Sequence, residues 1–409
     1  MPSPLAWTGP VTPASAARAR EYLQRAREAA LAGPEWPAPE ADPLPAPGTL
    51  AVVGAGTMGT GIAQCALAAG LAVHLIDARE DAARRGAAQI CASLERAQAS
   101  GRLAAADVRA RLERLRAGTD DGLLATADVA IEAVYEDLAL KQALFARLGR
   151  ACPGHALLLS NTSTLDIDAI AGGSGAAARA AGMHFLTPAH VTPLVEIVRG
   201  DATSDASLAQ AHALARRLGK LPVLAGKAWG FIGNRMFEGY LREVDALQLE
   251  GVPAERIDRA LERFGFALGP CRTLDMAGTD LVSQVLETRG RYVAQGPAYR
   301  RITRRLAELG RFGHKSGRGH YLYEGRAARP DPDLARVCAE EARRLGIAPR
   351  PDVDDGAIVA RCLQPLVDEG RQLLAEGMAR RAGDIDLVWV LGYGFPADRG
   401  GPMAMAGIA

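Results

Sequence analysis

The sequence predicts an α/β protein in which a doubly wound parallel sheet is followed by an all-helical region. Three observations support this fold class. Short apolar runs alternate with helical patterns between residues 48 and 228, as in strand–helix–strand units. A glycine-rich motif directly follows the first of these runs. From Asn234 onward the pattern is mostly helical, so the sheet is expected in the first half of the chain.

Length and composition limit the classes of function. The chain has 409 residues, which suggests two or three domains at about 150 residues each. Its 48 basic and 47 acidic residues give a net charge of +1, so neither nucleic acid nor an anionic membrane is an expected partner. The apolar runs are too short for a membrane span, and the first residues lack a secretory signal. We therefore expect a soluble, cytoplasmic protein.

The cysteines and lysines carry weaker information. The six cysteines are scattered and none forms a CxxC pair, so we expect reduced thiols and no metal site. Only four of the 48 basic residues are lysines. Under such a bias toward arginine, a lysine that remains, such as Lys141, is more often needed as lysine.

The elements are expected in the following order. Residues 1–47 comprise one helix, at 13–32, and a proline-rich extended linker. The domain at 48–228 carries the sheet. Buried strands are expected at 50–53, 72–76, 129–134, 156–159, 181–185 and 195–198, and helical segments at 58–69 and 78–115.

The helical region contains an internal repeat. Four dipeptides, Glu-Gly, Ile-Asp, Gly-Phe and Gly-Pro, occur in this order from Glu250 and again from Glu376. The two Ile-Asp pairs lie 128 residues apart, which is too long for a solenoid and suits a duplicated helical domain. We therefore expect a first helical domain at 229–325 and a second repeat at 326–409. The second repeat stops just after its Gly-Pro and is expected to be incomplete.

The glycine-rich motif predicts a Rossmann-type dinucleotide site. It has the pattern GxGxxG, lies between an apolar run and a helical pattern, and comprises Gly54, Gly56, Thr57, Met58 and Gly59. Such glycines permit a tight turn, close approach of a pyrophosphate and close helix–strand packing. Asp77 follows the next strand, near the spacing expected for a ribose-binding acid, and its charge favours NAD over NADP. Arg79 lies nearby and leaves NADP as the less favoured alternative.

Further motifs fall at the ends of the expected strands and together resemble one family. They are IEAVYEDLALK, SNTSTLDI, GMHFLTPAHVTPLVEIVRG, GFIGNRM, GFALGP, GHKSGRGHYLY and GYGFPADRGGP. With VGAGTMGTGIA, they resemble the L-3-hydroxyacyl-CoA dehydrogenase family, in particular the dehydrogenase part of the multifunctional fatty-acid β-oxidation enzymes. The resemblance covers about residues 48 to 409.

The resemblance implies roles for individual residues. His184 matches the catalytic base and Glu196 its carboxylate partner, Ser163 contacts the substrate oxygen, and Asn234 helps to hold the substrate and His184. An acid–base role suits an imidazole, which titrates near neutrality, and an unpartnered acid in the apolar run LVEIV would be costly.

The resemblance also implies the surroundings of the two ligands. Glu136, Lys141 and Asn161 match positions that line the nicotinamide ribose. Ser93 matches a position that can contact CoA, and Arg102 is a candidate for its phosphates. Without the family motifs, Asn161 and Ser163 could equally cap a helix.

The expected activity is the NAD-dependent oxidation of (S)-3-hydroxyacyl-CoA to 3-ketoacyl-CoA, or its reverse. Multifunctional members carry an enoyl-CoA hydratase domain before this part, and residues 1–47 are too short to form one. We therefore expect no hydratase activity. The incomplete second repeat is expected to expose apolar surface that a partner chain could cover, so a homodimer, or association with a separate hydratase or thiolase, is an expected arrangement. Two alternatives stay open: a dehydrogenase for another 3-hydroxy acid or a carrier-protein thioester, and a non-catalytic NAD-binding assembly subunit.

Overall fold

The computed structural model describes residues 7–33, 48–289, 295–325 and 327–408. The chain forms two compact units. The sheet unit comprises residues 26–231 and 378–380, and the helical unit comprises residues 1–25, 232–377 and 381–409. The proline-rich linker expected at 34–47 lies outside the described residues. The helix expected before it is present as α1 (Pro13–Ala32).

The sheet unit is built on eight strands in the order β3-β2-β1-β4-β5-β6-β7-β8. The strands, in chain order, are β1 (Thr49–Val53), β2 (Ala72–Ile76), β3 (Leu115–Gly118), β4 (Val129–Glu132), β5 (Leu157–Ser160), β6 (Ala180–Phe185), β7 (Leu194–Arg199) and β8 (Leu221–Gly226). All neighbouring strands are parallel except β6 and β7. The predicted fold class of the sheet is therefore confirmed.

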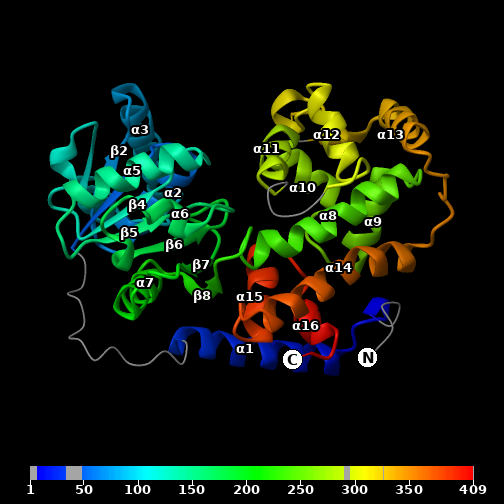
Figure 1. Cartoon of the computed structure of the whole chain (residues 1–409), viewed down its shortest axis with the longest axis horizontal. Helices are drawn as coiled ribbons and strands as arrows, with labels where there is room; N and C mark the ends of the chain where they lie inside the picture. Colours follow the sequence, from blue (N-terminus) through cyan, green and yellow to red (C-terminus); the bar gives the residue numbers. More distant parts are fainter. Residues whose placement is uncertain (1–6, 34–47, 290–294, 326, 409) are drawn as a thin grey trace. The chain divides into compact units, whose positions relative to one another are not determined.

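Helices cover both faces of this sheet (Figure 1). They are α2 (Thr57–Ala68), α3 (Glu80–Ala99), α4 (Ala105–Glu113), α5 (Leu138–Ala151), α6 (Ile167–Ala171) and α7 (Asp205–Arg217). Alternate strand residues, such as Leu50 and Val52, share one apolar cluster with α2, α3, α4 and α7. Ala51 and Val53 lie outside that cluster and are also buried, because strand neighbours point to opposite faces.

The structure corrects three expectations about these elements. The segment at 78–115 is not one helix, because α3 ends at Ala99 and α4 begins at Ala105. Strands β3 and β8 were not expected. Strand β7 was expected in a parallel sheet, but it runs antiparallel to β6. Residues 186–193 are too short for the crossover helix that a parallel return requires, so the chain turns back beside β6.

Besides the first part of α1, the helical unit contains α8–α16 and one small hairpin. Its helices are α8 (Gly233–Leu249), α9 (Ala254–Phe264), α10 (Pro270–Ala277), α11 (Thr279–Arg289), α12 (Arg301–Glu308), α13 (Pro332–Leu345), α14 (Asp355–Ala375), α15 (Ala382–Gly392) and α16 (Pro402–Met405). The hairpin pairs β9 (Tyr321–Glu324) with β10 (Ala327–Pro330). One-turn 3-10 segments lie at Asp121–Leu123 (η2), Ala177–Arg179 (η3), His314–Ser316 (η4) and Ala397–Arg399 (η5).

The internal repeat corresponds to a repeated contact. Asp258 on α9 accepts hydrogen bonds from the first amides of α10, Cys271 N at 2.8 Å and Arg272 N at 3.2 Å. Asp386 on α15 accepts the equivalent bonds from Met403 N at 2.7 Å and Ala404 N at 3.0 Å on α16. In both copies an aspartate therefore caps the helix that starts at the Gly-Pro pair.

Each of these aspartates also accepts a tyrosine hydroxyl, but from a different part of the chain. Tyr321 on β9 donates to Asp258 at 2.7 Å, whereas Tyr22 on α1 donates to Asp386 at 2.8 Å. Figure 1 shows α1 beside α15 and α16. The tyrosine hydroxyl therefore comes from α1 in the second repeat and from the β9–β10 hairpin in the first.

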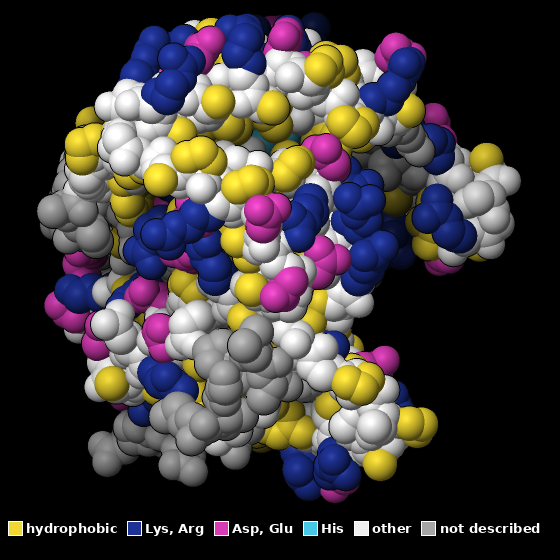
Figure 2. Space-filling model, turned by 90° about the vertical axis from the view of Figure 1, so that its right-hand side faces the viewer, with side chains coloured by type: hydrophobic (Ala, Val, Ile, Leu, Met, Phe, Trp, Pro, Cys, Tyr) yellow, Lys and Arg dark blue, Asp and Glu magenta, His cyan; other side chains and the backbone are white. Residues whose placement is uncertain are grey.

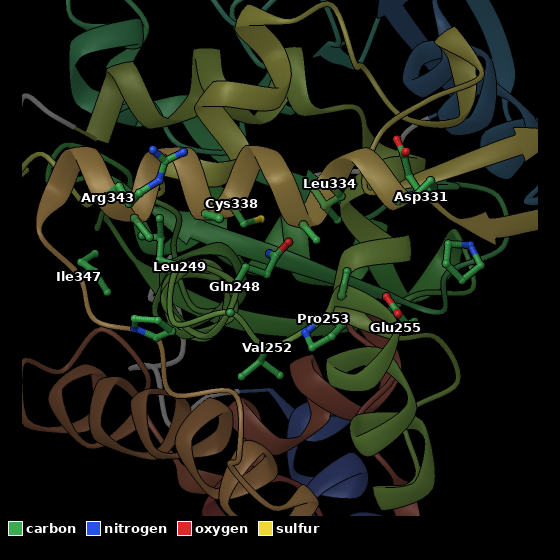
Figure 3. Close-up of a pocket in the computed structure, with 18 residues that line it drawn as sticks. Gln248, Leu249, Val252, Pro253, Glu255, Asp331, Leu334, Cys338, Arg343 and Ile347 are labelled. Carbon is green, nitrogen blue, oxygen red and sulfur yellow. The ribbon is translucent and has the colours of Figure 1, made fainter.

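The helical unit also contains an apolar pocket of about 540 Å³ (Figure 3). It lies between the end of α8, the start of α9 and α13, and its walls include Leu249, Val252, Leu334 and Cys338. None of the predicted site residues lines it. The residues expected to bind NAD lie instead in the sheet unit, at the C-terminal edge of the parallel strands, where open α/β sheets bind ligands.

The molecular surface carries charges of both signs. On the face shown in Figure 2, lysine and arginine side chains lie among aspartate and glutamate side chains. Ion pairs at the surface of the protein include Arg336–Glu340 and Arg263–Asp355. No helix in the described ranges is long and apolar enough to cross a membrane.

Candidate active site

The glycine-rich turn connects β1 to α2 and is closely packed at two of its three glycines. Gly54 has a φ of 107°, and a Cβ there would lie 2.5 Å from the carbonyl oxygen of Ala133. A Cβ on Gly59 would lie 1.8 Å from the carbonyl oxygen of Gly54. At Gly56 an added Cβ would meet nothing within 4 Å. The turn is therefore tight, and its backbone is open to a pyrophosphate at Gly56.

The first turn of α2 and the end of β2 complete a dinucleotide-binding edge. Thr57 and Met58 begin α2, whose free N–H groups carry partial positive charge toward an anionic ligand. Asp77 follows β2, and its Oδ2 accepts a hydrogen bond from Ala55 N at 2.9 Å. This half-buried carboxylate lies against the turn, where it can accept bonds from ribose hydroxyls. Exposed Arg79 is paired with Asp81. The glycine-rich turn and Asp77 therefore fit NAD as the ligand.

A buried ion pair lies beside this edge. Glu132, at the end of β4, has no exposed surface, and Lys141 on α5 is 1% exposed. The Lys141 ammonium donates to both oxygens of Glu132, at 2.7 and 2.8 Å. It also lies 3.3 Å from Glu136 Oε2. Lys141 is therefore directed toward two carboxylates, which fixes its position at the edge.

Glu136 holds the loop that follows β5. Its Oε1 accepts bonds from Thr162 Oγ1 at 2.7 Å, Ser163 N at 2.7 Å and Ser163 Oγ at 3.0 Å. Thr164 contributes its N–H at 3.1 Å and its hydroxyl at 3.3 Å. Burial raises the pKa of Glu136, but Lys141 and these donors hold it below its ordinary value. The ionised carboxylate therefore positions Ser163.

A histidine and a glutamate face each other across β6 and β7. His184 and Glu196 are paired in register, and His184 Nδ1 lies 2.7 Å from Glu196 Oε2. Glu196 has no exposed surface and His184 is 5% exposed. The ring of Phe231 packs 5.7 Å from the imidazole, centre to centre. Because Nδ1 faces Glu196, Nε2 is the nitrogen that can exchange a proton with a substrate.

Comparison with known proteins identifies the family. Residues 49–228 match the NAD-binding domain of 3-hydroxyacyl-CoA dehydrogenase, and residues 230–323 match its C-terminal domain. The crystal structure of 3-hydroxybutyryl-CoA dehydrogenase from Escherichia coli K12 superimposes with a TM-score of 0.75 and 30% identity, covering 88% of this chain and 91% of that chain. The chain belongs to the 3-hydroxyacyl-CoA dehydrogenase family. The predicted family, cofactor and enzyme class are confirmed.

Several relatives that are longer than this chain are named as bifunctional or multifunctional proteins. A peroxisomal bifunctional enzyme from Danio rerio is 39% identical over 371 residues, which are 87% of this chain and 51% of that protein. The dehydrogenase part of multifunctional enzyme 1 from C. elegans is 28% identical with a TM-score of 0.62, covering 92% of this chain and 86% of that chain. The chain spans about half the length of the curated relatives it matches.

The sheet unit of this dehydrogenase brings most of the predicted residues to one edge. Asn161 begins the loop after β5, and its Oδ1 accepts a bond from Phe185 N at 2.8 Å, which ties this loop to the end of β6. Glu132 was not predicted as a site residue. The signal that could have identified it is an acid inside an otherwise apolar strand, as at Glu196.

The remaining predicted residues lie elsewhere, and their roles stay predictions. Asn234 is in the first turn of α8, in the helical unit, where its Oδ1 accepts the hydroxyl of Tyr393 at 2.7 Å. Ser93 is half-buried on α3, and exposed Arg102 donates to Ser100 Oγ at 2.9 Å. In the described parts of the chain, no group of three or more His, Cys, Asp or Glu side chains could hold a metal ion.

Proposed function

We propose that the protein oxidises (S)-3-hydroxyacyl-CoA to 3-ketoacyl-CoA with NAD, or catalyses the reverse, with His184 as the general base. The observation that carries this proposal is the buried 2.7 Å contact between His184 and Glu196, in the same sheet unit as the NAD-binding turn. A carboxylate on one ring nitrogen fixes the tautomer in which the other nitrogen accepts a proton.

In the proposed oxidation, each residue of the site has a different role. His184 Nε2 removes the proton from the 3-hydroxyl, and Glu196 stabilises the imidazolium that forms. NAD, held at the glycine-rich turn, would supply the acceptor for the hydride from C3. Ser163, held by Glu136, contacts the substrate oxygen. In the reverse direction, His184 returns the proton to the oxygen.

The test is the consumption of NADH with acetoacetyl-CoA, followed by absorbance. His184→Ala should lower kcat by about 10²- to 10⁴-fold, which is the usual contribution of a positioned acid–base group. His155→Ala is a matched control, because His155 is exposed and precedes β5, at the opposite edge of the sheet. NADH binding should be retained in both variants.

Three outcomes would contradict this proposal. Equal rates for the wild type and His184→Ala would remove His184 as the base. NADH binding without turnover of any acyl-CoA, together with a stable protein partner, would favour the assembly-subunit alternative. Activity on free 3-hydroxy acids or carrier-protein thioesters, but not on CoA esters, would reassign the substrate.

We further propose a role in fatty-acid β-oxidation, a cytoplasmic location, and either a homodimer or a complex with a separate hydratase or thiolase. The β-oxidation role is supported by the relatives, among them a peroxisomal fatty acid beta-oxidation multifunctional protein from Arabidopsis thaliana at 34% identity. Those relatives are peroxisomal by name, so cell fractionation must decide between the two compartments. Light scattering of the purified protein, alone and with candidate enzymes, tests the assembly.

A further inference from the structure

Two carboxylates share one ammonium at the end of β4. Glu132, Lys141 and Glu136 form this group, which we call the charge triad. Lys141 lies within 3.3 Å of both acids, and Glu132 and Lys141 are almost completely buried. Within the described ranges, Lys141 is the only cation paired with either carboxylate. The charge triad therefore carries a net charge of −1.

The other contacts of the triad do not neutralise this charge. Glu132 also accepts the hydroxyl of Ser160 and the N–H of Val134 at 3.2 Å. The donors to Glu136 are the hydroxyls and amides of residues 162–164, all of which are neutral. Such donors add no positive charge. The negative charge is thus built into the edge of the sheet.

The strand order places the triad on one half of the cofactor. Asp77, the ribose-binding acid, follows β2, and the pyrophosphate-binding turn follows β1. In the order β3-β2-β1-β4-β5-β6, strands β4 and β5 lie on the other side of β1 from β2. A dinucleotide that crosses this edge has its adenosine on the β2 side and its nicotinamide on the β4 side. Glu136 therefore belongs to the nicotinamide half.

We propose that the charge triad stabilises bound NAD⁺ relative to bound NADH. The nicotinamide ring is cationic in NAD⁺ and neutral in NADH, while the rest of the cofactor is the same. A fixed negative charge near the ring stabilises the oxidised form selectively, because the site is partly buried and screening is weak. This inference rests on the NAD-binding domain and not on the proposed hydroxyacyl substrate.

The test is the ratio of the two dissociation constants, Kd(NADH)/Kd(NAD⁺). NADH binding is measured by its fluorescence, and NAD⁺ binding by displacement of NADH. Glu136→Gln removes one charge while keeping an amide oxygen for the loop donors. We expect this ratio to fall by about tenfold, since the loss of one nearby unit charge at intermediate dielectric has about that effect. Most of the change should come from weaker NAD⁺ binding.

Two matched variants separate charge from positioning. Glu136→Asp keeps the charge but shortens the side chain, so both affinities should fall and the ratio should be retained. Thr164→Val removes one neutral donor to Glu136 and should likewise leave the ratio unchanged. If Glu136→Gln weakens both forms by the same factor, the proposal is overturned and Glu136 acts only by holding the loop. Because no acyl-CoA is present, this result is independent of the proposed reaction.

Discussion

The buried carboxyl of Asp386 predicts that the helical unit becomes less stable as the pH rises. Burial raises the pKa of Asp386 from 3.8 to about 7, although Met403 N, Tyr22 Oη and Ala404 N donate to the carboxylate. At pH values between 3.8 and about 7, the folded state therefore binds more protons than the unfolded state. Its stability is highest at low pH and is lost progressively up to about pH 7.

The size of this effect follows from the two pKa values. The rise from 3.8 to about 7 corresponds to about 4 kcal/mol, because one pKa unit is worth 1.36 kcal/mol. About 3 kcal/mol of this lies between pH 4.5 and pH 8. Asp386→Asn cannot titrate, so the comparison of wild type and variant isolates this group from all other titrating groups.

The assay is urea unfolding at several pH values, followed by the fluorescence of the tryptophans, among them the buried Trp389 on α15. The difference in unfolding free energy, wild type minus variant, should fall by about 3 kcal/mol from pH 4.5 to pH 8. A difference that stays constant over this range would show that Asp386 is ionised throughout. In that case the three donors outweigh burial, and the argument is wrong.

Three further variants test other contacts. Tyr22→Phe removes the hydroxyl donor to Asp386 and should lower the free energy of unfolding by about 1 to 2 kcal/mol in a denaturant titration. Lys141→Met leaves the Glu132 carboxylate buried and unpaired, so a loss of about 3 to 5 kcal/mol is expected; an unchanged Tm would refute this. In Gly56→Ala the added Cβ meets no protein atom within 4 Å, so the Tm should be unchanged. NADH binding, measured by fluorescence titration, should be weaker because the Cβ stands where the pyrophosphate approaches. Unaltered NADH affinity would place the pyrophosphate elsewhere.

The sequence predicted the interior of the sheet better than its edges. Strands β1 and β2 are apolar runs that are buried on both faces, so their boundaries were predicted to within one residue. The two unexpected strands, β3 and β8, are the edge strands of the order. Strand β3 exposes Arg116 and Ala117, and β8 contains Pro222, which an edge strand tolerates because one side of its backbone needs no partner.

The parts of the candidate site that could be predicted are those in which a chemically reactive residue lies on or just after an expected strand. His184 and Glu196 were paired from their motifs, and the antiparallel register of β6 and β7 places them opposite each other. The partner of Lys141 was not predictable, because several acids lie near it in sequence. Only the fold shows that Glu132 accepts two of its hydrogen bonds while Glu136 faces the loop after β5.

The bond between Tyr22 and Asp386 has a consequence for the order in which the protein is made. The two residues are 364 positions apart. At a synthesis rate of about 5 to 20 residues per second, the ribosome reaches Asp386 about 20 to 70 s after Tyr22. During this interval Tyr22 has no Asp386 to which it can donate. The contact between α1 and the second repeat can therefore form only after Asp386 has been synthesised, whereas Ala30 of the same helix can meet His212 earlier.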